Sequence, residues 1–149
     1  FFLMIRRPPR STRRSSDLHL NVMFTGGWLN ARTCQALKPY KLSHQQYNVL
    51  RILRGAPGHS ANLCEIRARM LDRMSNATRL VEKLRLKGLL TRETCADNRR
   101  KVDIRLTDKG LQLLAVLDDT LNGLHDGRAR QLTDAEAAQL NALLDKMRG

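Results

Sequence analysis

Apolar residues recur at spacings of three and four along much of the chain, a pattern that predicts amphipathic helices rather than strands. The first such stretch, residues 20–37, contains the pair Gly26-Gly27, so we expect the helix to be bent or closely packed there. Glycines inside a helix cost about 1 kcal/mol each relative to alanine. Pro39 then ends the helix, because the residue before a proline disfavours the helical conformation.

Three further helix starts can be predicted in the middle of the chain. Ser43 is a good first cap, with Gln46 as its capping-box partner. Ser60 or Asn62 opens the next helix, and Ser75 caps a third, which ends at Gly88. The second and third are short and separated by a tight turn, which is the outline of a helix-turn-helix.

Period-two alternation follows the third helix. Residues 89–94 and 102–106 predict a β-hairpin whose loop is residues 95–101. Thr107 and Thr133 then cap two C-terminal helices rich in leucine. The order helix-turn-helix, hairpin, helix predicts a winged helix-turn-helix, a mainly α fold with a small β-hairpin wing (α+β).

Composition indicates the kind of partner. The chain has 149 residues, of which 42% are hydrophobic and 4% aromatic, consistent with one domain built on an aliphatic helical core. Its net charge of +13 suggests a polyanion, either nucleic acid or an anionic membrane surface. We expect no membrane association, because no apolar run approaches the roughly 20 residues that span a bilayer and the cations gather on one helix and the hairpin.

Residues 1–18 are expected to be translated sequencing-adaptor read-through or a disordered basic arm, since they begin without methionine and are rich in arginine. Without their five arginines and one aspartate, the net charge falls from +13 to +9, so the basic character persists. We expect residues 19–149 to form a single domain. Within it, we expect residues 43–106 to form the winged-helix lobe, flanked by the helices of residues 19–38 and 107–149.

The hairpin carries the adjacent cations Arg99, Arg100 and Lys101. Their mutual repulsion is small in water, and near DNA each neutralised phosphate releases counterions and favours binding. Arginines can also enter a narrow minor groove. Asp97 is expected to hold the turn and orient one of the arginines.

The helix from Ser75 is the expected reader of the major groove. Arginine pairs with guanine, asparagine with adenine, and serine or threonine with bases or phosphates. The polar residues expected to contact DNA are Ser75, Asn76, Thr78, Arg79 and Lys83. Leu86 also falls on this outer face, where we expect it to pack against the wing or another helix.

Three segments together resemble the MarR family of bacterial winged-helix regulators: Arg79–Leu89 (RLVEKLRLKGL), Asp97–Arg100 (DNRR) and Leu106–Gly110 (LTDKG). The resemblance covers about residues 20–149. It implies a homodimer joined by the first and the last two helices, bound to double-stranded DNA at a pseudo-palindromic operator. It also implies repression released by a small ligand or an oxidant. Asp97 and Arg99 match the wing motif of the family, whose arginine enters the minor groove.

Dimerisation is also expected from the leucine pattern alone. Residues 111–149 form two leucine-rich helices beside a small domain that already has a core, and such a stripe is unfavourable in water.

The sequence is compatible with two kinds of regulation, by an effector ligand or by a redox switch. The expected crevice between the lobe and the dimerisation helices is bordered by aromatic and histidine residues suited to a flat aromatic ligand, namely Trp28, Tyr40, His44 and Tyr47. Alternatively, Cys34 or Cys95 could act as a redox-sensing thiol, Cys95 because the wing arginines would lower its pKa. A winged helix that binds protein or RNA is a further alternative.

Catalytic chemistry is not expected. The four histidines share no metal-ligand spacing, and the sequence has no phosphate loop or dinucleotide motif. We therefore predict that the protein is not an enzyme and uses no cofactor or metal. Three widely spaced cysteines do not form a disulfide framework, which favours the reducing cytoplasm, with the protein on the nucleoid.

Overall fold

The structure, a computed structural model, describes residues 15–72, 74–95, 98–129 and 132–149. It is mainly helical with one small antiparallel sheet, which confirms the predicted fold class. The elements in chain order are α1 (Ser15–Leu37), the 3-10 turn η1 (Lys38–Tyr40), α2 (His44–Arg54), the 3-10 turn η2 (Pro57–His59), β1 (Ser60–Asn62), α3 (Leu63–Arg69), α4 (Ala77–Leu86), β2 (Leu90–Cys95), β3 (Asn98–Leu106), α5 (Asp108–Ala129) and α6 (Asp134–Arg148).

Capping boxes begin three of the helices. Ser43 caps α2, Asn62 caps α3 and Thr133 caps α6, each by accepting a backbone hydrogen bond from the residue three positions later. The predicted helix starts at Ser43 and Thr133 are confirmed. Of the two predicted alternatives for the next helix, Ser60 and Asn62, the cap is Asn62. Ser60 instead begins strand β1.

Helix α4 begins one residue later than the sequence predicts. Asn76 is its cap and accepts from the Arg79 backbone N–H at 3.0 Å, so the expectation that Ser75 caps this helix is wrong. Its C-terminus follows the prediction. Gly88 has a left-handed backbone with φ of 70°, and the N–H of Leu89 donates to Leu84 O at 3.1 Å, as in a Schellman motif.

The sheet has three strands in the order β1-β3-β2. The sequence predicts only the β2–β3 hairpin, because β1 has three residues, too few to display alternation. Strand β2 has the predicted length but is shifted by one residue and reaches Cys95, whereas β3 is longer than predicted and begins at Asn98. The predicted loop over residues 95–101 is therefore wrong, and the cations Arg99–Lys101 lie on a strand.

The core lies where α2, α4, the sheet and α5 meet. Leu50 and Leu53 of α2, Leu84 of α4 and Leu114 of α5 are fully buried there. Leu37, at the end of α1, joins the same cluster and attaches the first helix to the lobe.

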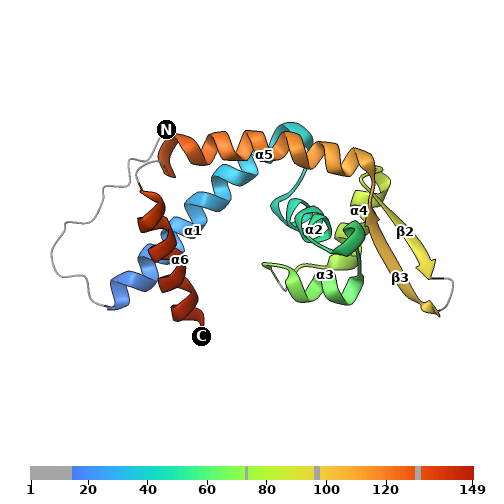
Figure 1. Ribbon diagram of the computed structural model, residues 1–149, viewed down its shortest axis with the longest axis horizontal. Helices are drawn as coiled ribbons and strands as arrows, with labels where there is room; N and C mark the ends of the chain where they lie inside the picture. The colour runs from blue at the N-terminus through green and yellow to red at the C-terminus, as the bar shows by residue number, and fades with distance from the viewer. Residues whose placement is uncertain (1–14, 73, 96–97, 130–131) are drawn as a thin grey trace.

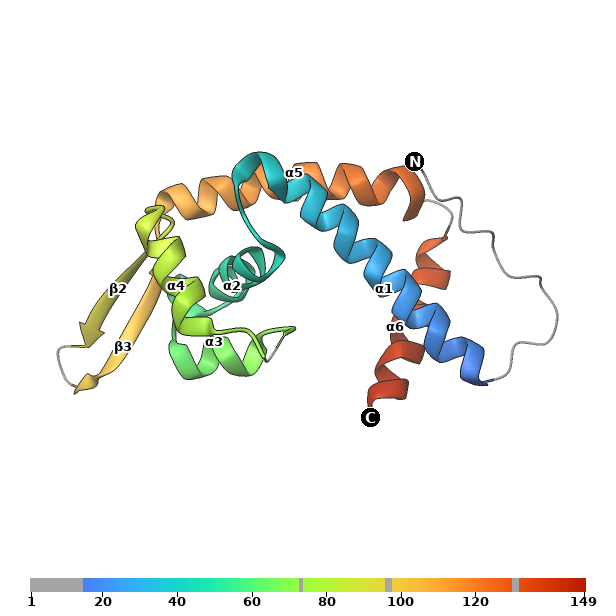
Figure 2. The ribbon, with the colours of Figure 1, turned by 180° about the vertical axis from the view of Figure 1, so that it is seen from behind.

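Helix α5 connects the two ends of the molecule (Figures 1 and 2). Its first turns lie beside α4 and the wing strands, its middle is crossed by α1, and its far end leads to α6. The wing and α6 therefore lie at opposite ends. Around Gly26 and Gly27 a Cβ would meet nothing within 4 Å, so the expected close packing at this pair is not found within the chain.

Candidate nucleic-acid interface

Helix α4 separates buried from exposed side chains along its length. Ala77, Val81 and Leu84 pack into the core. Thr78, Arg79 and Lys83 are exposed on the rest of its surface, as the 3.6-residue period requires. Three of the five predicted reader residues therefore present free polar groups to solvent on one helix.

The two predicted readers at the start of α4 have structural partners. The Ser75 hydroxyl donates to Asp72 Oδ2 at 2.6 Å, and Asn76 Oδ1 is occupied by the helix cap. Bidentate recognition of adenine uses both the oxygen and the nitrogen of an asparagine amide, so capping competes with the reading role expected for Asn76.

The turn before α4 is held by hydrogen bonds. Asp72 accepts from Ser75 and also from the Met74 N–H, at 3.0 Å; these bonds, the Ser75 bond first, lower the pKa of its carboxyl group. Asn48 on α2 accepts from the Leu71 N–H at 3.0 Å, which attaches the turn to the preceding helix. The orientation of α4 is therefore fixed from both sides of the turn.

An ion pair lies further along the exposed surface of α4. Arg85 donates to both carboxylate oxygens of Glu82, with Nε–Oε2 at 3.0 Å and Nη2–Oε1 at 2.8 Å. Leu86, next to it, is 73% exposed, so the expectation that it packs against the wing or another helix is wrong within the chain.

The wing strands carry exposed arginines on both sides. Arg92 on β2 and Arg105 on β3 are exposed, and Arg105 Nη1 donates to Gly58 O at 2.7 Å. Asp97 lies outside the described residues, as do the side chains of residues 94–101, including Cys95, Arg99, Arg100 and Lys101. Their backbone is informative, because the adjacent residues Thr94 and Cys95 pair with Val102 and Asn98. Arg99–Lys101 therefore span a register shift, where the ladder is interrupted.

The base of the wing is tied to both α4 and α5. Thr107 Oγ1 donates to Gly88 O at 2.9 Å and accepts from the Gly110 N–H at 3.1 Å, which confirms Thr107 as the cap of α5. Lys109 Nζ donates to Lys87 O at 3.1 Å, while Lys87 itself donates to Lys41 O. Burial lowers the pKa of Lys87. These bonds couple the end of the reader helix to the start of α5.

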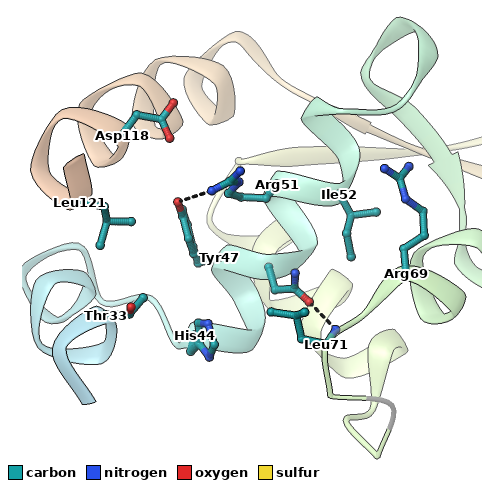
Figure 3. A pocket seen from close by; sticks show the side chains of 10 residues that line it. Thr33, His44, Tyr47, Arg51, Ile52, Arg69, Leu71, Asp118 and Leu121 are labelled. Atoms are coloured by element: carbon teal, nitrogen blue, oxygen red, sulfur yellow. Dashed lines mark hydrogen bonds between the residues drawn. The ribbon is translucent and has the colours of Figure 1, made fainter. Parts of the chain in front are cut away.

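A cavity of about 480 Å³ lies between the lobe and the helices α1 and α5 (Figure 3). Its lining comes from elements far apart in the sequence: Thr33, His44, Tyr47, Asn48, Arg51, Ile52, Arg69, Leu71, Asp118 and Leu121. Two of the four predicted pocket residues, His44 and Tyr47, line it. Trp28 and Tyr40 do not; Trp28 is 40% exposed on α1, with the Arg32 guanidinium 5.0 Å from its ring centre.

Charged groups border the cavity on several sides. Arg51 Nη1 donates to the Tyr47 hydroxyl at 3.4 Å (Figure 3). Asp118 on α5 is paired with Arg54 on α2, with Nη2–Oδ1 at 3.2 Å. The hydrogen bond to Asp118 raises the pKa of Arg54. The sequence did not predict that Arg51, Arg69 and Asp118 line the cavity. Charged residues on three separate helices share no recognisable sequence pattern.

The two cysteines with described side chains are exposed. Cys34 on α1 lies 3.9 Å from Asn30 Oδ1, and Cys64 lies on α3. Among the residues that the structure describes, no three histidine, cysteine, aspartate or glutamate side chains come together as metal ligands would. Within the same residues, none of the helices is both long enough and apolar enough to cross a membrane.

The lobe formed by α2–α4 and the β2–β3 wing defines a winged helix-turn-helix protein. Residues 42–102 match the sequence model of the MarR family. This match assigns residues 42–102 to the MarR family, as the motifs suggest, and a solved member of that family shares the fold of the chain. Members of the family are transcription regulators rather than enzymes, in agreement with the prediction that this chain is not an enzyme.

A curated relative comes from Thauera aromatica, where it is named as a candidate transcriptional regulatory protein for the hcr operon. The two sequences are 30% identical over 101 residues, which is 68% of this chain and 60% of the relative's own length.

Two solved structures share the fold. A MarR family transcriptional regulator of Streptomyces coelicolor, in complex with DNA, matches with a TM-score of 0.77 and 18% identity over 96% of this chain and 91% of its own. BpsR of Bordetella bronchiseptica matches with a TM-score of 0.74 and 22% identity over 95% of this chain and 98% of its own. That structure addresses how 6-hydroxynicotinic acid regulates the DNA binding of BpsR.

Proposed function

We propose that the protein is a sequence-specific regulator of transcription that binds double-stranded DNA as a homodimer at a pseudo-palindromic operator. The observation that carries this proposal is the pairing of an exposed polar surface on α4 with a wing whose β3 strand holds three successive cations. The fold shared with a family member in complex with DNA supports it.

The proposed contacts divide between the two grooves. Arg79, with Thr78 and Lys83 beside it, enters the major groove and reads base edges or phosphates. Arg99, Arg100 and Lys101 follow the wing to the minor groove, and Asp97 holds the turn before them. Ser75 and Asn76 contribute mainly by fixing the start of α4, because both are already hydrogen-bonded there.

The homodimer is proposed to form through residues 19–38 and 107–149, leaving residues 43–106 as the DNA-binding lobe. The support is a set of large apolar side chains that this single chain leaves exposed on α1 and at α6: Leu18, Leu20, Met23, Phe24, Trp28, Leu29, Leu132, Leu140, Leu143 and Met147. Exposed apolar surface of this extent is typical of an interaction site.

We further propose that an aromatic small molecule occupies the cavity between α2 and α5 and releases repression. His44 and Tyr47 offer flat surfaces, and Arg51 and Arg69 offer hydrogen-bond donors to a carboxylate or phenolate. Because α2 belongs to the lobe and α5 leads to α6, a ligand between them would bias how the two parts are arranged. The regulation of BpsR by 6-hydroxynicotinic acid supports this role.

The comparisons favour this function over the two alternatives, a redox regulator working through Cys34 or Cys95 and a winged helix that binds protein or RNA. A regulator of chromosomal genes would work in the cytoplasm, at the nucleoid.

Binding of the full chain to a short random-sequence duplex, titrated with NaCl, tests the proposal. We expect affinity to fall steeply with salt, and we expect Arg99→Ala to bind every duplex more weakly, with a salt slope shallower by about 1. An RNA duplex of the same length serves as the comparison. Equal binding to RNA and DNA, or no binding to either, would contradict the proposal.

A further inference from the structure

An acidic side chain, Glu82, lies on the exposed surface of α4 that the proposed function assigns to DNA. Glu82 follows Arg79 by three residues on α4, and residues at this spacing are neighbours on a helix surface. Its side chain is 45% exposed. A carboxylate in this position would approach a polyanion, so its presence on the reading helix calls for a physical explanation.

Two arginines act on Glu82, one by hydrogen bonds and one by its charge. Arg85 on the same helix chelates the carboxylate with two hydrogen bonds of 3.0 and 2.8 Å. Arg92 comes from strand β2, which packs against α4. The pKa of Glu82 is lowered mainly by the hydrogen bonds from Arg85, and the charge of Arg92 lowers it further. Glu82 is therefore ionised at neutral pH and holds one arginine in a fixed orientation.

This arrangement lowers the charge that α4 offers to DNA. An arginine whose guanidinium is engaged with a carboxylate is less free to neutralise a phosphate, and the carboxylate itself repels the backbone. Both effects weaken binding to any sequence, because the phosphate contribution is independent of sequence. The contacts of Arg79 with base edges are not affected in the same way, since they depend on hydrogen-bond pattern.

We propose that Glu82 tunes the affinity of the DNA-binding surface: by holding Arg85 and by its own charge it lowers the sequence-independent part of DNA binding. Operator and random DNA share these phosphate contacts, so both affinities fall together. This inference rests on the proposed function, since it concerns the same DNA-binding surface.

The test compares the full-length protein with its Glu82→Gln variant on a random-sequence duplex over a range of NaCl concentrations. We expect the variant to bind roughly two- to fivefold more tightly at low salt. We also expect its slope of log affinity against log salt to become more negative by about 0.9, which corresponds to one additional phosphate contact. Glu136→Gln on α6 is the matched control, because it makes the same charge change at the opposite end of the molecule and glutamine retains its capping-box role.

A second comparison tests the part played by Arg85. In an Arg85→Ala background, Glu82→Gln should change the salt slope clearly less than in the unmodified protein, because Arg85 is no longer there to be released and only the charge of Glu82 and its effect on Arg92 remain. Unchanged affinity and slope in the single variant would overturn the inference. So would an altered base preference at one position without tighter random binding, since Glu82 would then read a cytosine. If the unmodified protein shows no salt-dependent binding to any duplex, the proposed function itself fails.

Discussion

Asn76 shows how the role of one side chain depends on its backbone neighbours. Ser75 and Asn76 are both favoured capping residues and both face outward, so the sequence cannot decide between them. The decision comes from Asp72, which engages the Ser75 hydroxyl and leaves Asn76 to cap α4. The exposed positions of Thr78, Arg79 and Lys83 follow from helix periodicity alone and were predictable.

Replacing Asn76 therefore tests a structural role against a reading role. We expect Asn76→Ala to lower the free energy of unfolding by about 1 kcal/mol, the usual cost of a lost cap, and Asn76→Asp to restore it. Denaturant titration measures both. Arg79→Ala is the contrast: it should change unfolding by less than about 0.5 kcal/mol but relax base preference at one position per half-site by about 1–3 kcal/mol.

The reading role would be supported instead if Asn76→Ala left unfolding unchanged and removed a preference for adenine. In that case the hydrogen bond between Asn76 Oδ1 and the Arg79 N–H would have no measurable value as a cap.

Elements with strong local signals were predictable, and elements that depend on remote partners were not. The caps at Ser43 and Thr133 and the stop at Gly88 each use residues within a few positions of one another. Strand β1 forms only because it pairs with β3, about forty residues later in the chain, with Asn62 opposite Asp103. The start of β3 at Asn98 likewise depends on pairing across the hairpin, with Cys95, because Arg99–Lys101 have no alternating pattern that would predict a strand.

Gly110 marks the closest approach between α5 and the wing. A Cβ at this position would lie 2.3 Å from Leu89 O and 2.9 Å from Leu106 Cδ2. We expect Gly110→Ala to destabilise the fold by about 1–3 kcal/mol, because the first turn of α5 must move away from β2 and β3. Thermal or denaturant unfolding measures the change.

Gly55→Ala is the matched control. Its Cβ would make only ordinary contacts, the nearest at 3.6 Å, and its backbone φ of −82° suits alanine. We expect a change within about 0.5 kcal/mol. Equal effects at Gly55 and Gly110 would mean that close approach is not the reason for glycine at the start of α5.

At the scale of the whole molecule, the two ends of a single chain differ in how much apolar surface they expose. The lobe has a closed core, whereas α1 and α6 expose large apolar side chains. Helix α6 and the start of α1 lie at the end of the molecule away from the wing (Figure 1). The leucine pattern of residues 111–149 predicted an exposed apolar surface on both C-terminal helices. On α6 large apolar side chains are exposed, but on α5 the prediction is wrong for Leu114, Leu117 and Leu121, which are buried in the core of the same chain. The cavity was less predictable from the sequence, because its lining residues come from four helices. Trp28 and Tyr40, which were predicted to line it, lie outside it.

A charge introduced on α6 tests the proposed dimer. Leu143 is 56% exposed there, and we expect Leu143→Lys to weaken self-association about tenfold or more, because an unpaired ammonium would have to be buried in the interface. Sedimentation measures the oligomeric state. Leu86→Lys is the control, since Leu86 is also a leucine and is more exposed than Leu143, but lies on α4. A dimer indifferent to Leu143→Lys would place the interface elsewhere.

The most direct test of the whole account is selection of binding sites by the full-length protein from a pool of random duplex DNA. We predict enrichment of a palindrome whose half-sites lie about one helical turn, roughly 34 Å, apart, because a two-fold dimer presents its two α4 helices to successive major grooves. Arg79→Ala should blur one position in each half-site. A folded dimer that enriches no sequence, or only an asymmetric one, would contradict the account.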